Sequence, residues 1–284
     1  MGAFEARRVK SPTSSVEKGD TPMGHVKRND YDGLVLNEVC DGAVTAAFTE
    51  RTGGVSKPPY ASLNLGSHVG DDLAAVLENR RRVLDALGCV DDLDRLLVPN
   101  QVHGDGVAVV REGSFDELRA VRGQIAEGAD AIVCVAAHVP VLLCFADCVP
   151  VVLTCPDGFA VVHSGWKGTI ARISAKAASI LCEAAECPAS SVRAYIGPHI
   201  LGDEYEVSQE LMERFCAEFG WVDTGDSRML DLGRAIRQAL VETGVPEDAV
   251  CDLGLSTARC NDRFFSYRAE KGTCGRHAAV AVMV

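Results

Sequence analysis

Residues 131–155 read AIVCVAAHVPVLLCFADCVPVVLTC, a run long and apolar enough to resemble a membrane-spanning helix. Pro140, Asp147 and Pro150 interrupt it. Proline ends or kinks a helix, whereas turns between short strands accept both proline and aspartate. The run therefore predicts buried β-strands joined by turns rather than one helix.

Further short segments on both sides of this run have the same character. They are rich in β-branched and aliphatic side chains and are bounded by Gly, Pro or Asp, as buried strands are. With the strands inside the run, the expected strands cover residues 43–48, 96–98, 106–110, 131–135, 139–145, 151–154, 160–163, 192–196 and 277–282.

Helical spacing of apolar residues appears between these strands. It runs over residues 73–87, after the capping candidates Asp71 and Asp72 and before Gly88. Three more helices are expected over residues 169–185, 208–219 and 231–243, the second of them capped by Ser208. Together the elements predict an α+β fold with mixed β-sheets covered by helices, a layered α/β/β/α sandwich.

The domain limits follow from composition. Residues 1–29 are polar, charged and rich in Ser, Thr and Gly, which predicts a disordered N-terminal lead-in. Residues 30–284 contain no internal repeat and no proline-rich linker, so we expect one domain there. Monomer and homodimer are both compatible with the sequence.

Charge and cysteine content narrow the class of protein. The chain of 284 residues has a formal net charge of −12, which works against binding nucleic acid or an anionic membrane. A small-molecule partner is favoured, and an anionic substrate would need a local cluster of Arg and Lys. The chain has 12 cysteines, but its first 30 residues hold no apolar signal-peptide core, so we expect free thiols in a cytoplasmic protein.

Three short segments place reactive side chains at the ends of expected strands, where sites are usually built. They read NQVHG (100–104), ADCVPV (146–151) and VHSGWKGT (162–169). Taken singly, each histidine or cysteine is typical of a hydrogen-bonded or packed core residue. Their spacing is also unlike that of a zinc finger or an H-E-x-x-H helix.

A wider set of motifs resembles one family closely, from about residue 33 to the C-terminus. In addition to those three segments, the motifs are RTGGVS (51–56), SLNLG (62–66), IGP (196–198), YEV (205–207), FFSYR (264–268) and GR (275–276). In this order they resemble the laccase-domain family, also called multicopper polyphenol oxidases or peptidoglycan-editing factors. That family includes the bacterial relatives of the mammalian purine enzyme FAMIN.

The resemblance implies a single catalytic domain with a zinc site of two histidines and one cysteine, carried onto His103, Cys148 and His163. It also implies phosphorolysis of adenosine, inosine and methylthioadenosine to the base and the sugar 1-phosphate, with adenosine deamination as a companion reaction. Its substrates would be a nucleoside and inorganic phosphate. Three protein ligands leave one tetrahedral position open, as a catalytic zinc requires.

Further site residues are assigned by the chemistry they would have to supply. Asp147 would carry protons in deamination, and Asn64 and Gln101 would position ribose or base. Phosphate would be held by arginine or lysine and by the helix N-terminus at Thr169. The cationic candidates are Arg51, Lys167, Arg268 and Arg276, and Tyr205 and Ser266 complete the substrate-binding set. Of these, Arg51, Asn64 and Asp147 join Cys148 in the expected catalytic group.

Three alternatives stay open at this point. Copper also uses imidazole and thiolate ligands, although seven histidines are few for a multicopper oxidase. A cysteine hydrolase would use Cys148 as nucleophile and His163 as base. A structural zinc would need a fourth protein ligand, for which His199 is the candidate. His199 and Ala269 depart from the residues expected in the family motifs.

Overall fold

The apolar run at residues 131–155 forms three strands in the computed structural model, which describes residues 26–222 and 227–284. These are β5 (Ala131–Cys134), β6 (Val141–Phe145) and β7 (Val149–Cys155), and every residue in them is buried. Within the described ranges, no helix has the length and apolar character needed to cross a membrane. The prediction of buried strands is confirmed.

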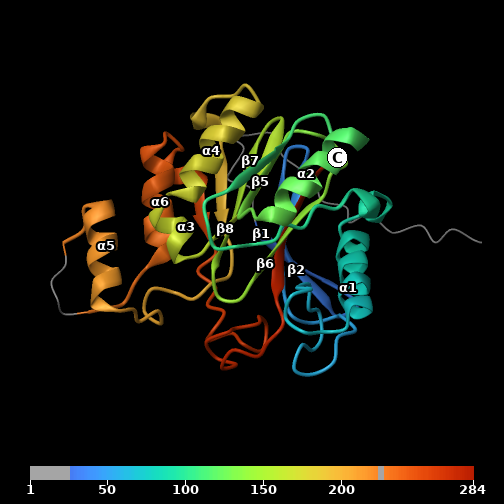
Figure 1. The fold of residues 1–284 in the computed structure, drawn as a ribbon, viewed down its shortest axis with the longest axis horizontal. Coiled ribbons are helices and arrows are strands. Elements are labelled where there is room, and N and C mark those ends of the chain that lie inside the picture. The colour runs from blue at the N-terminus through green and yellow to red at the C-terminus, as the bar shows by residue number, and fades with distance from the viewer. Residues whose placement is uncertain (1–25, 223–226) are drawn as a thin grey trace, which may run out of the picture.

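The strands form two sheets (Figure 1). One is entirely antiparallel, with the order β1 (Val26–Tyr31), β2 (Leu34–Asp41), β3 (Val44–Thr49), β11 (His277–Met283), β6. The other is mixed, with the order β10 (Val250–Asp252), β9 (Arg193–Ile196), β7, β8 (Gly158–Ser164), β5, β4 (Val107–Val110). Only its two outer pairs, β10–β9 and β4–β5, run parallel. The run at 131–155 therefore contributes to both sheets, through β6 in one and β5 and β7 in the other.

Successive side chains of a strand point to opposite faces of its sheet, and this divides the core into layers. Ala131 and Val133 pack with residues of α4 (Ile173–Ala184), α5 (Gln209–Phe219) and α6 (Leu232–Glu242). Ile132 and Cys134 face the other way, into a core shared by the two sheets and α2 (Phe115–Glu127). The outer face of the five-stranded sheet packs against α1 (Leu73–Ala86). This arrangement is the expected α+β fold, a layered α/β/β/α sandwich.

Helix boundaries agree with the capping residues that the sequence offers. Asp72, Ser208 and Asp231 accept hydrogen bonds from main-chain N–H groups in the first turns of α1, α5 and α6. The predicted helix at 169–185 is two helices, α3 (Trp166–Ile170) and α4, because Arg172 between them takes a left-handed conformation. Short 3₁₀ helices at Val90–Arg95, Ala189–Ser191 and Glu247–Ala249 complete the structure.

Two expectations need correction. The strand expected at 96–98 is only a single bridge between Leu97 and Val141, because this segment runs beside β6 for one residue. Residues 26–29, assigned to the disordered lead-in, begin β1, where main-chain pairing with β2 compensates for the polar side chains. Residues 1–25 lie outside the described part. The sequence prediction also omitted β2, α2 and β10.

Candidate functional site

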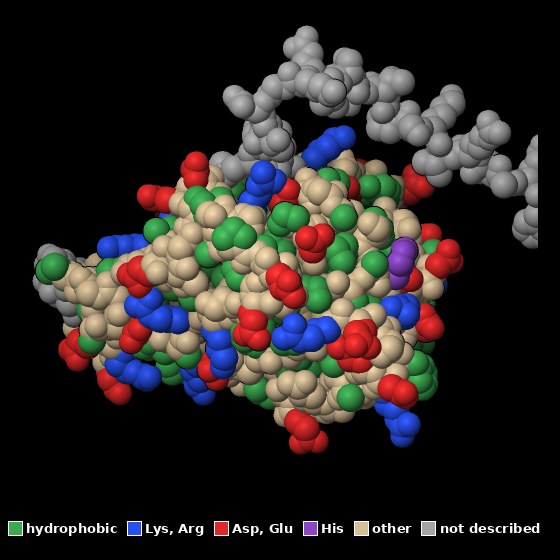
Figure 2. All heavy atoms as spheres, turned by 90° about the horizontal axis from the view of Figure 1, so that it is seen from above, with side chains coloured by type: hydrophobic (Ala, Val, Ile, Leu, Met, Phe, Trp, Pro, Cys, Tyr) green, Lys and Arg blue, Asp and Glu red, His purple; other side chains and the backbone are tan. Residues whose placement is uncertain are grey.

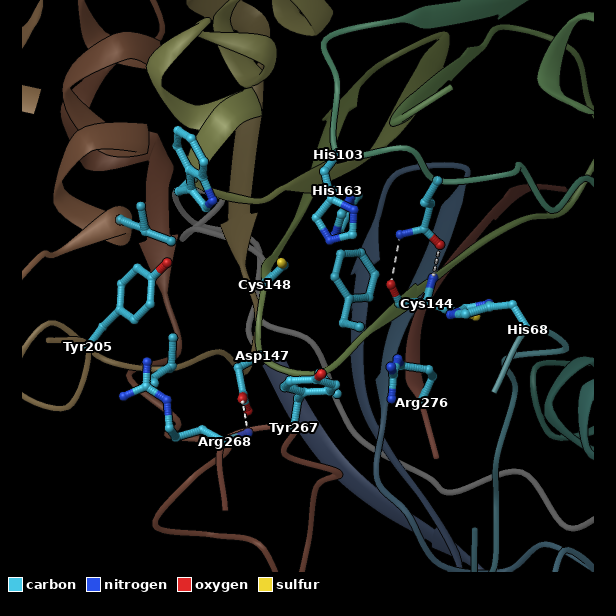
Figure 3. Close-up of a pocket in the computed structure, with 16 residues that line it drawn as sticks. His68, His103, Cys144, Asp147, Cys148, His163, Tyr205, Tyr267, Arg268 and Arg276 are labelled. Atoms are coloured by element: carbon cyan, nitrogen blue, oxygen red, sulfur yellow. Dashed lines mark hydrogen bonds between the residues drawn. The ribbon is translucent and has the colours of Figure 1, made fainter. Parts of the chain in front are cut away.

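Two loops and the end of one strand bring the expected metal ligands together. His103 lies in the loop before β4, Cys148 immediately precedes β7, and His163 lies near the end of β8. Their side-chain donor atoms all lie within 4.8 Å of one another, and the two imidazole rings meet edge to face with centroids 4.8 Å apart (Figure 3). The structure therefore brings together three predicted ligands, of which the first and the last are 60 positions apart in the sequence.

Asp130, which sequence reasoning missed, holds this group from behind. Its carboxylate is fully buried and lies 2.7 Å from Nδ1 of His163. It also accepts main-chain hydrogen bonds from His103 at 3.0 Å and Gly104 at 2.7 Å. One carboxylate thus fixes the ring of one ligand and the backbone of another. Because Asp130 contacts Nδ1 of His163, Nε2 of that ring is the nitrogen available to a metal.

The charges at the group favour a thiolate. Burial alone would raise the pKa of the Cys148 thiol, but His163 and His103 outweigh that effect and lower it to about 6. Burial alone would lower the pKa of His163, but Cys148 and Asp130 reverse that effect and raise it to about 9. Both shifts have the same physical origin, a cysteine thiolate stabilised by adjacent imidazoles.

Gly165 keeps the front of the group open. A Cβ at this position would lie 3.2 Å from Sγ of Cys148 and 3.2 Å from Cδ2 of His103. Its backbone is in the extended region, with a φ of −74°, so the constraint comes from space and not from an unusual conformation. The glycine in the HSGW motif is therefore explained by the close approach of two ligands.

The group opens into a cavity of about 490 Å³, within the size range of small-molecule sites. Figure 3 shows that residues from several separate segments converge on it. The lining residues are His68, Gln101, His103, Cys144, Phe145, Ala146, Asp147, Cys148, His163, Trp166, Ile200, Tyr205, Leu232, Tyr267, Arg268 and Arg276. The cavity thus combines the metal-ligand group with an apolar and aromatic surface and two arginines.

Five of the further predicted site residues line this cavity, and hydrogen bonds hold Asp147 and Gln101 at both ends of their polar groups. Both oxygens of Asp147 accept hydrogen bonds, from the Thr257 hydroxyl at 2.7 Å and the Arg268 main chain at 2.8 Å. The Gln101 side chain bonds at both amide ends to the main chain of Cys144, at 2.7 and 2.8 Å. The other three lining residues are Tyr205, Arg268 and Arg276.

The remaining five do not line the cavity. Arg51 pairs with Glu270 and stacks on Phe265, and Lys167 lies over the ring of Trp166. Asn64, Thr169 and Ser266 are buried. Asn64 bonds to Gly66, Asp71 and the distant main chain of Arg276, and Ser266 accepts from the Ala269 main chain. The helix N-terminus expected at Thr169 is wrong, because α3 begins at Trp166 and Thr169 bonds back to Ser164 and Gly165. Their contacts organise the loops around the cavity.

Other lining residues were not selected from the sequence. His68 follows the SLNLG motif by two positions, and Trp166 and Tyr267 directly precede the predicted cationic residues Lys167 and Arg268. Asp130 had a detectable signal, a carboxylate directly before a fully apolar strand, since buried charges need partners. His199 lies outside both the ligand group and the cavity lining; its Nδ1 contacts the Gly197 carbonyl oxygen at 2.8 Å.

The donor set fits a metal ion of the zinc type. Two imidazole nitrogens and one thiolate sulfur are ligands that zinc prefers, and copper also accepts them. Asp130 behind His163 supplies the carboxylate that usually orients a metal-bound histidine. Among the described residues this is the one group of histidine, cysteine and carboxylate side chains close enough to hold a metal. The three ligands leave room for a further ligand on the cavity side.

The sequence matches a family model and several named proteins over most of its length. The family model described as "Multi-copper polyphenol oxidoreductase laccase" matches residues 45–284. A protein of Deinococcus radiodurans named purine nucleoside phosphorylase is 38% identical over 256 residues, which is 87% of this chain and 92% of that protein. Purine nucleoside phosphorylase YfiH of Escherichia coli is 33% identical, over 83% of this chain and 92% of its own length.

Solved structures agree with these sequence matches. The crystal structure of YlmD from Geobacillus stearothermophilus superposes with a TM-score of 0.79 at 28% identity, over 91% of this chain and 99% of that one. A Bacillus licheniformis protein described as hypothetical protein YfiH gives a TM-score of 0.79 at 30% identity, over 90% of this chain and 98% of that one. The chain therefore belongs to the laccase-like multi-copper polyphenol oxidoreductase family, together with the purine nucleoside phosphorylases of the YfiH and YlmD type.

Proposed function

We propose that the protein is a zinc-dependent purine nucleoside phosphorylase that converts adenosine and phosphate to adenine and ribose 1-phosphate. Inosine and methylthioadenosine are further proposed substrates. One observation carries the proposal: the His103–Cys148–His163 group opens into a cavity that also presents arginines and an aromatic and apolar surface. The names of the related proteins support the same activity.

The proposed reaction exchanges one bond at the sugar for another. A phosphate oxygen forms a bond to C1′ while the bond from C1′ to the purine nitrogen breaks, and the base leaves with that electron pair. Overall, the proton of hydrogen phosphate ends on the base. The protein must therefore hold the phosphate on one face of the sugar and the base on the other.

The cavity offers a suitable surface for each part of the substrate. Trp166, Ile200, Tyr205 and Leu232 give an apolar and aromatic surface on which a purine can pack. Arginine guanidinium groups bind phosphate oxygens with paired N–H donors. Burial raises the pKa of Tyr205, so its hydroxyl stays protonated near neutral pH and can donate a hydrogen bond.

His103, Cys148 and His163 would hold the zinc. When bound there, zinc supplies a Lewis acid and lowers the pKa of coordinated water. Asp130 keeps the His163 ring in place, and Gln101 ties the loop carrying His103 to the main chain of Cys144 in β6. Those contacts limit the movement of the ligand group while substrate enters and product leaves.

We also propose adenosine deamination at the same site. This reaction needs a carboxylate near the purine to carry protons. Asp147 lines the cavity beside Cys148, and its hydrogen bonds from Thr257 and Arg268 fix the direction of its carboxylate. These contacts favour a positioned proton acceptor.

Product analysis tests the proposal. The purified protein is incubated with adenosine, with and without inorganic phosphate, and the bases and nucleosides are separated by chromatography. Adenine that forms only with phosphate supports phosphorolysis, and inosine that forms without phosphate supports deamination. Absence of both products from metal-loaded protein would contradict the proposed function. Oxygen-dependent turnover of phenols with bound copper would favour an oxidase.

A second candidate is a cysteine hydrolase, favoured by one observation. The Cys148 thiolate, the His163 imidazole and the Asp130 carboxylate form the nucleophile, base and orienting group of such an enzyme. A second imidazole, from His103, also reaches the thiolate, which favours metal binding over a simple catalytic triad. A hydrolytic activity that Cys148→Ala abolishes without loss of metal would support the hydrolase.

A further inference from the structure

Two basic side chains of the cavity wall have no acidic partner. Arg276 and His68 both line the cavity, and in the view of Figure 3 they lie on the other side of the ligand group from Tyr205 and Arg268. No carboxylate in the described part of the chain lies within 4.0 Å of the Arg276 guanidinium, whereas Arg28, Arg51 and Arg263 pair with Glu50 or Glu270. In a protein of net charge −12, an unpaired arginine facing a cavity indicates an anionic ligand.

The Arg276 side chain is held in a defined direction. One terminal nitrogen, Nη1, donates to the main-chain oxygens of Cys274 at 3.0 Å and Gly275 at 2.9 Å. The main-chain N–H of Arg276 donates to Asn64, which fixes the start of the side chain. Among the described residues, no acceptor lies within hydrogen-bond distance of Nε or Nη2 of Arg276. That edge of the guanidinium is available for the paired hydrogen bonds that a phosphate takes.

Gly66 makes room for both the Arg276 and the His68 side chains. A Cβ at residue 66 would lie 2.8 Å from Cγ of Arg276 and 3.3 Å from Cε1 of His68. The first distance is shorter than a real contact allows, so any larger residue would displace the arginine stem. The last glycine of the SLNLG motif therefore places Arg276 and His68 next to each other.

The surroundings of His68 have a positive potential. Desolvation at the cavity wall and the neighbouring charges of Arg276 and Arg80 lower the pKa of His68. Arg80 is buried, bonds to the main-chain oxygen of Leu65, and has no carboxylate within 4.0 Å in the described part of the protein. Arg276 and His68 thus face the cavity without a carboxylate partner, and Arg80 adds a positive charge near His68. The lowered pKa keeps the His68 imidazole neutral near pH 7, where it can donate one N–H hydrogen bond.

We propose that Arg276 and His68 form the oxyanion subsite that binds phosphate, with the purine at the opposite, Tyr205 side of the cavity. This inference rests on the proposed function and extends it, because it selects one of the four cationic candidates and adds a histidine. Arg51 and Lys167 do not line the cavity, and Arg268 is an exposed side chain beside Tyr205. The ligand class is a tetrahedral oxyanion, either inorganic phosphate or the phosphate group of a sugar 1-phosphate.

Direct binding of inorganic phosphate, measured by titration calorimetry without nucleoside, tests this subsite. Arg276→Gln should raise the Kd for phosphate about tenfold or more, because two charge-assisted hydrogen bonds are lost. Arg276→Lys should recover only part of the loss, and His68→Asn should raise the Kd several-fold. The matched control Arg119→Gln removes the same charge from an exposed position on α2 and should leave the Kd unchanged.

Gly66→Ala gives an independent variant that keeps every charged group. It should also weaken phosphate binding, and thermal unfolding shows whether each variant is folded. Two results would overturn the subsite: no saturable binding of phosphate to the wild-type protein, or a raised Kd for Arg268→Gln with none for Arg276→Gln. Ribose 1-phosphate that competes with phosphate would show that both sources of the anion use the subsite; without competition, the subsite would take free phosphate only.

The design separates this inference from the proposed function. Phosphate binding is measured without turnover, so a protein that produces inosine but no adenine would contradict phosphorolysis without affecting the binding result. If phosphorolysis is observed, Arg276→Gln should raise the KM for phosphate while the KM for adenosine stays within about twofold. A rise confined to the KM for adenosine would place Arg276 at the nucleoside instead.

Discussion

Nδ1 of His163 and Oδ1 of Asp130 lie 2.7 Å apart, and both side chains are buried. The same carboxylate accepts the main-chain N–H groups of His103 and Gly104. One aspartate therefore orients two of the three proposed metal ligands. We expect the proposed metal centre to depend on this residue as well as on the ligands themselves.

Asp130→Asn should weaken metal binding about 10–100-fold, the usual effect of losing the carboxylate behind a metal-bound histidine. The amide nitrogen would also face main-chain N–H groups, which should lower the free energy of unfolding by about 1–3 kcal/mol. Competition with a colorimetric zinc chelator measures the first effect and urea unfolding the second. Asp105→Asn, at an exposed carboxylate paired with Lys176, is the control. Unchanged zinc affinity in Asp130→Asn would show that Asp130 does not hold the ligands in place.

Gly165→Ala tests the space in front of the ligands. Its Cβ would press on Cys148 and His103, and overpacking of this kind costs about 1–3 kcal/mol. Zinc affinity should fall accordingly, by about 5- to 150-fold, with the chain still folded. Gly123→Ala is the matched control, since a Cβ there meets no atom within 4 Å and the residue lies within α2. The control should keep full metal content; if both variants keep it, the explanation of Gly165 is wrong.

Gln101 should act on the metal centre and not on the nucleoside. The side-chain amide of Gln101 makes two hydrogen bonds to the main chain of Cys144, one through its nitrogen and one through its oxygen. Gln101→Ala should therefore loosen the loop that carries His103. We expect weaker zinc binding and a lower kcat, with the KM for adenosine nearly unchanged when zinc is saturating. Steady-state kinetics at several zinc concentrations distinguishes the two roles. A large rise in the KM for adenosine at saturating zinc would support the substrate-binding role expected from the sequence.

Glu50 links the first strand to a C-terminal loop, and this link should depend on pH. Arg28 at 2.7 Å and Arg263 at 2.6 Å contact its carboxylate, whose side chain is only 2% exposed. Burial alone would raise the pKa of Glu50, but the two arginines hold it below its ordinary value. A lowered folded-state pKa adds stability that is complete above the unfolded value of about 4.3 and is lost as pH falls further.

Glu50→Gln should therefore lower the free energy of unfolding at pH 7 by about 1–3 kcal/mol. The difference from wild type should shrink as the pH is lowered below about 4. Urea unfolding over a series of pH values measures both effects. Glu78→Gln, on the more exposed surface of α1, should cost less than about 1 kcal/mol. A constant difference between wild type and Glu50→Gln at all pH values would exclude the ionised carboxylate as the cause.

Most of the fold was predictable because the core strands are uniformly apolar. Residues 131–155 have few polar side chains; Pro140 and Asp147 lie in the turns before and after β6, whereas Pro150 lies inside β7. Helix α2 was also predictable: Ser114 caps it, and Leu118, Val121 and Ile125 are buried along one face. By contrast, β1 is held by main-chain pairing and by Arg28, and neither contact is visible from local sequence.

For the candidate site, the sequence predicted the three proposed metal ligands but only some of the other cavity residues. His103, Cys148 and His163 came from motifs whose spacing alone gave no ligand geometry, and their proximity depends on the packing of two loops against the end of β8. Arg51 is a motif residue like Arg276, but Glu270 pairs with it outside the cavity. Sequence cannot distinguish these two arginines, because the difference lies in which partner the folded chain brings to each.

X-ray absorption at the metal edge identifies both the metal and its ligands in one spectrum. We expect zinc with one sulfur at about 2.3 Å and nitrogen or oxygen ligands at about 2.0–2.1 Å, two of them imidazole. Cys148→Ala should remove the sulfur contribution or the metal itself. A copper edge, or a zinc spectrum that keeps its sulfur ligand in Cys148→Ala, would contradict the account.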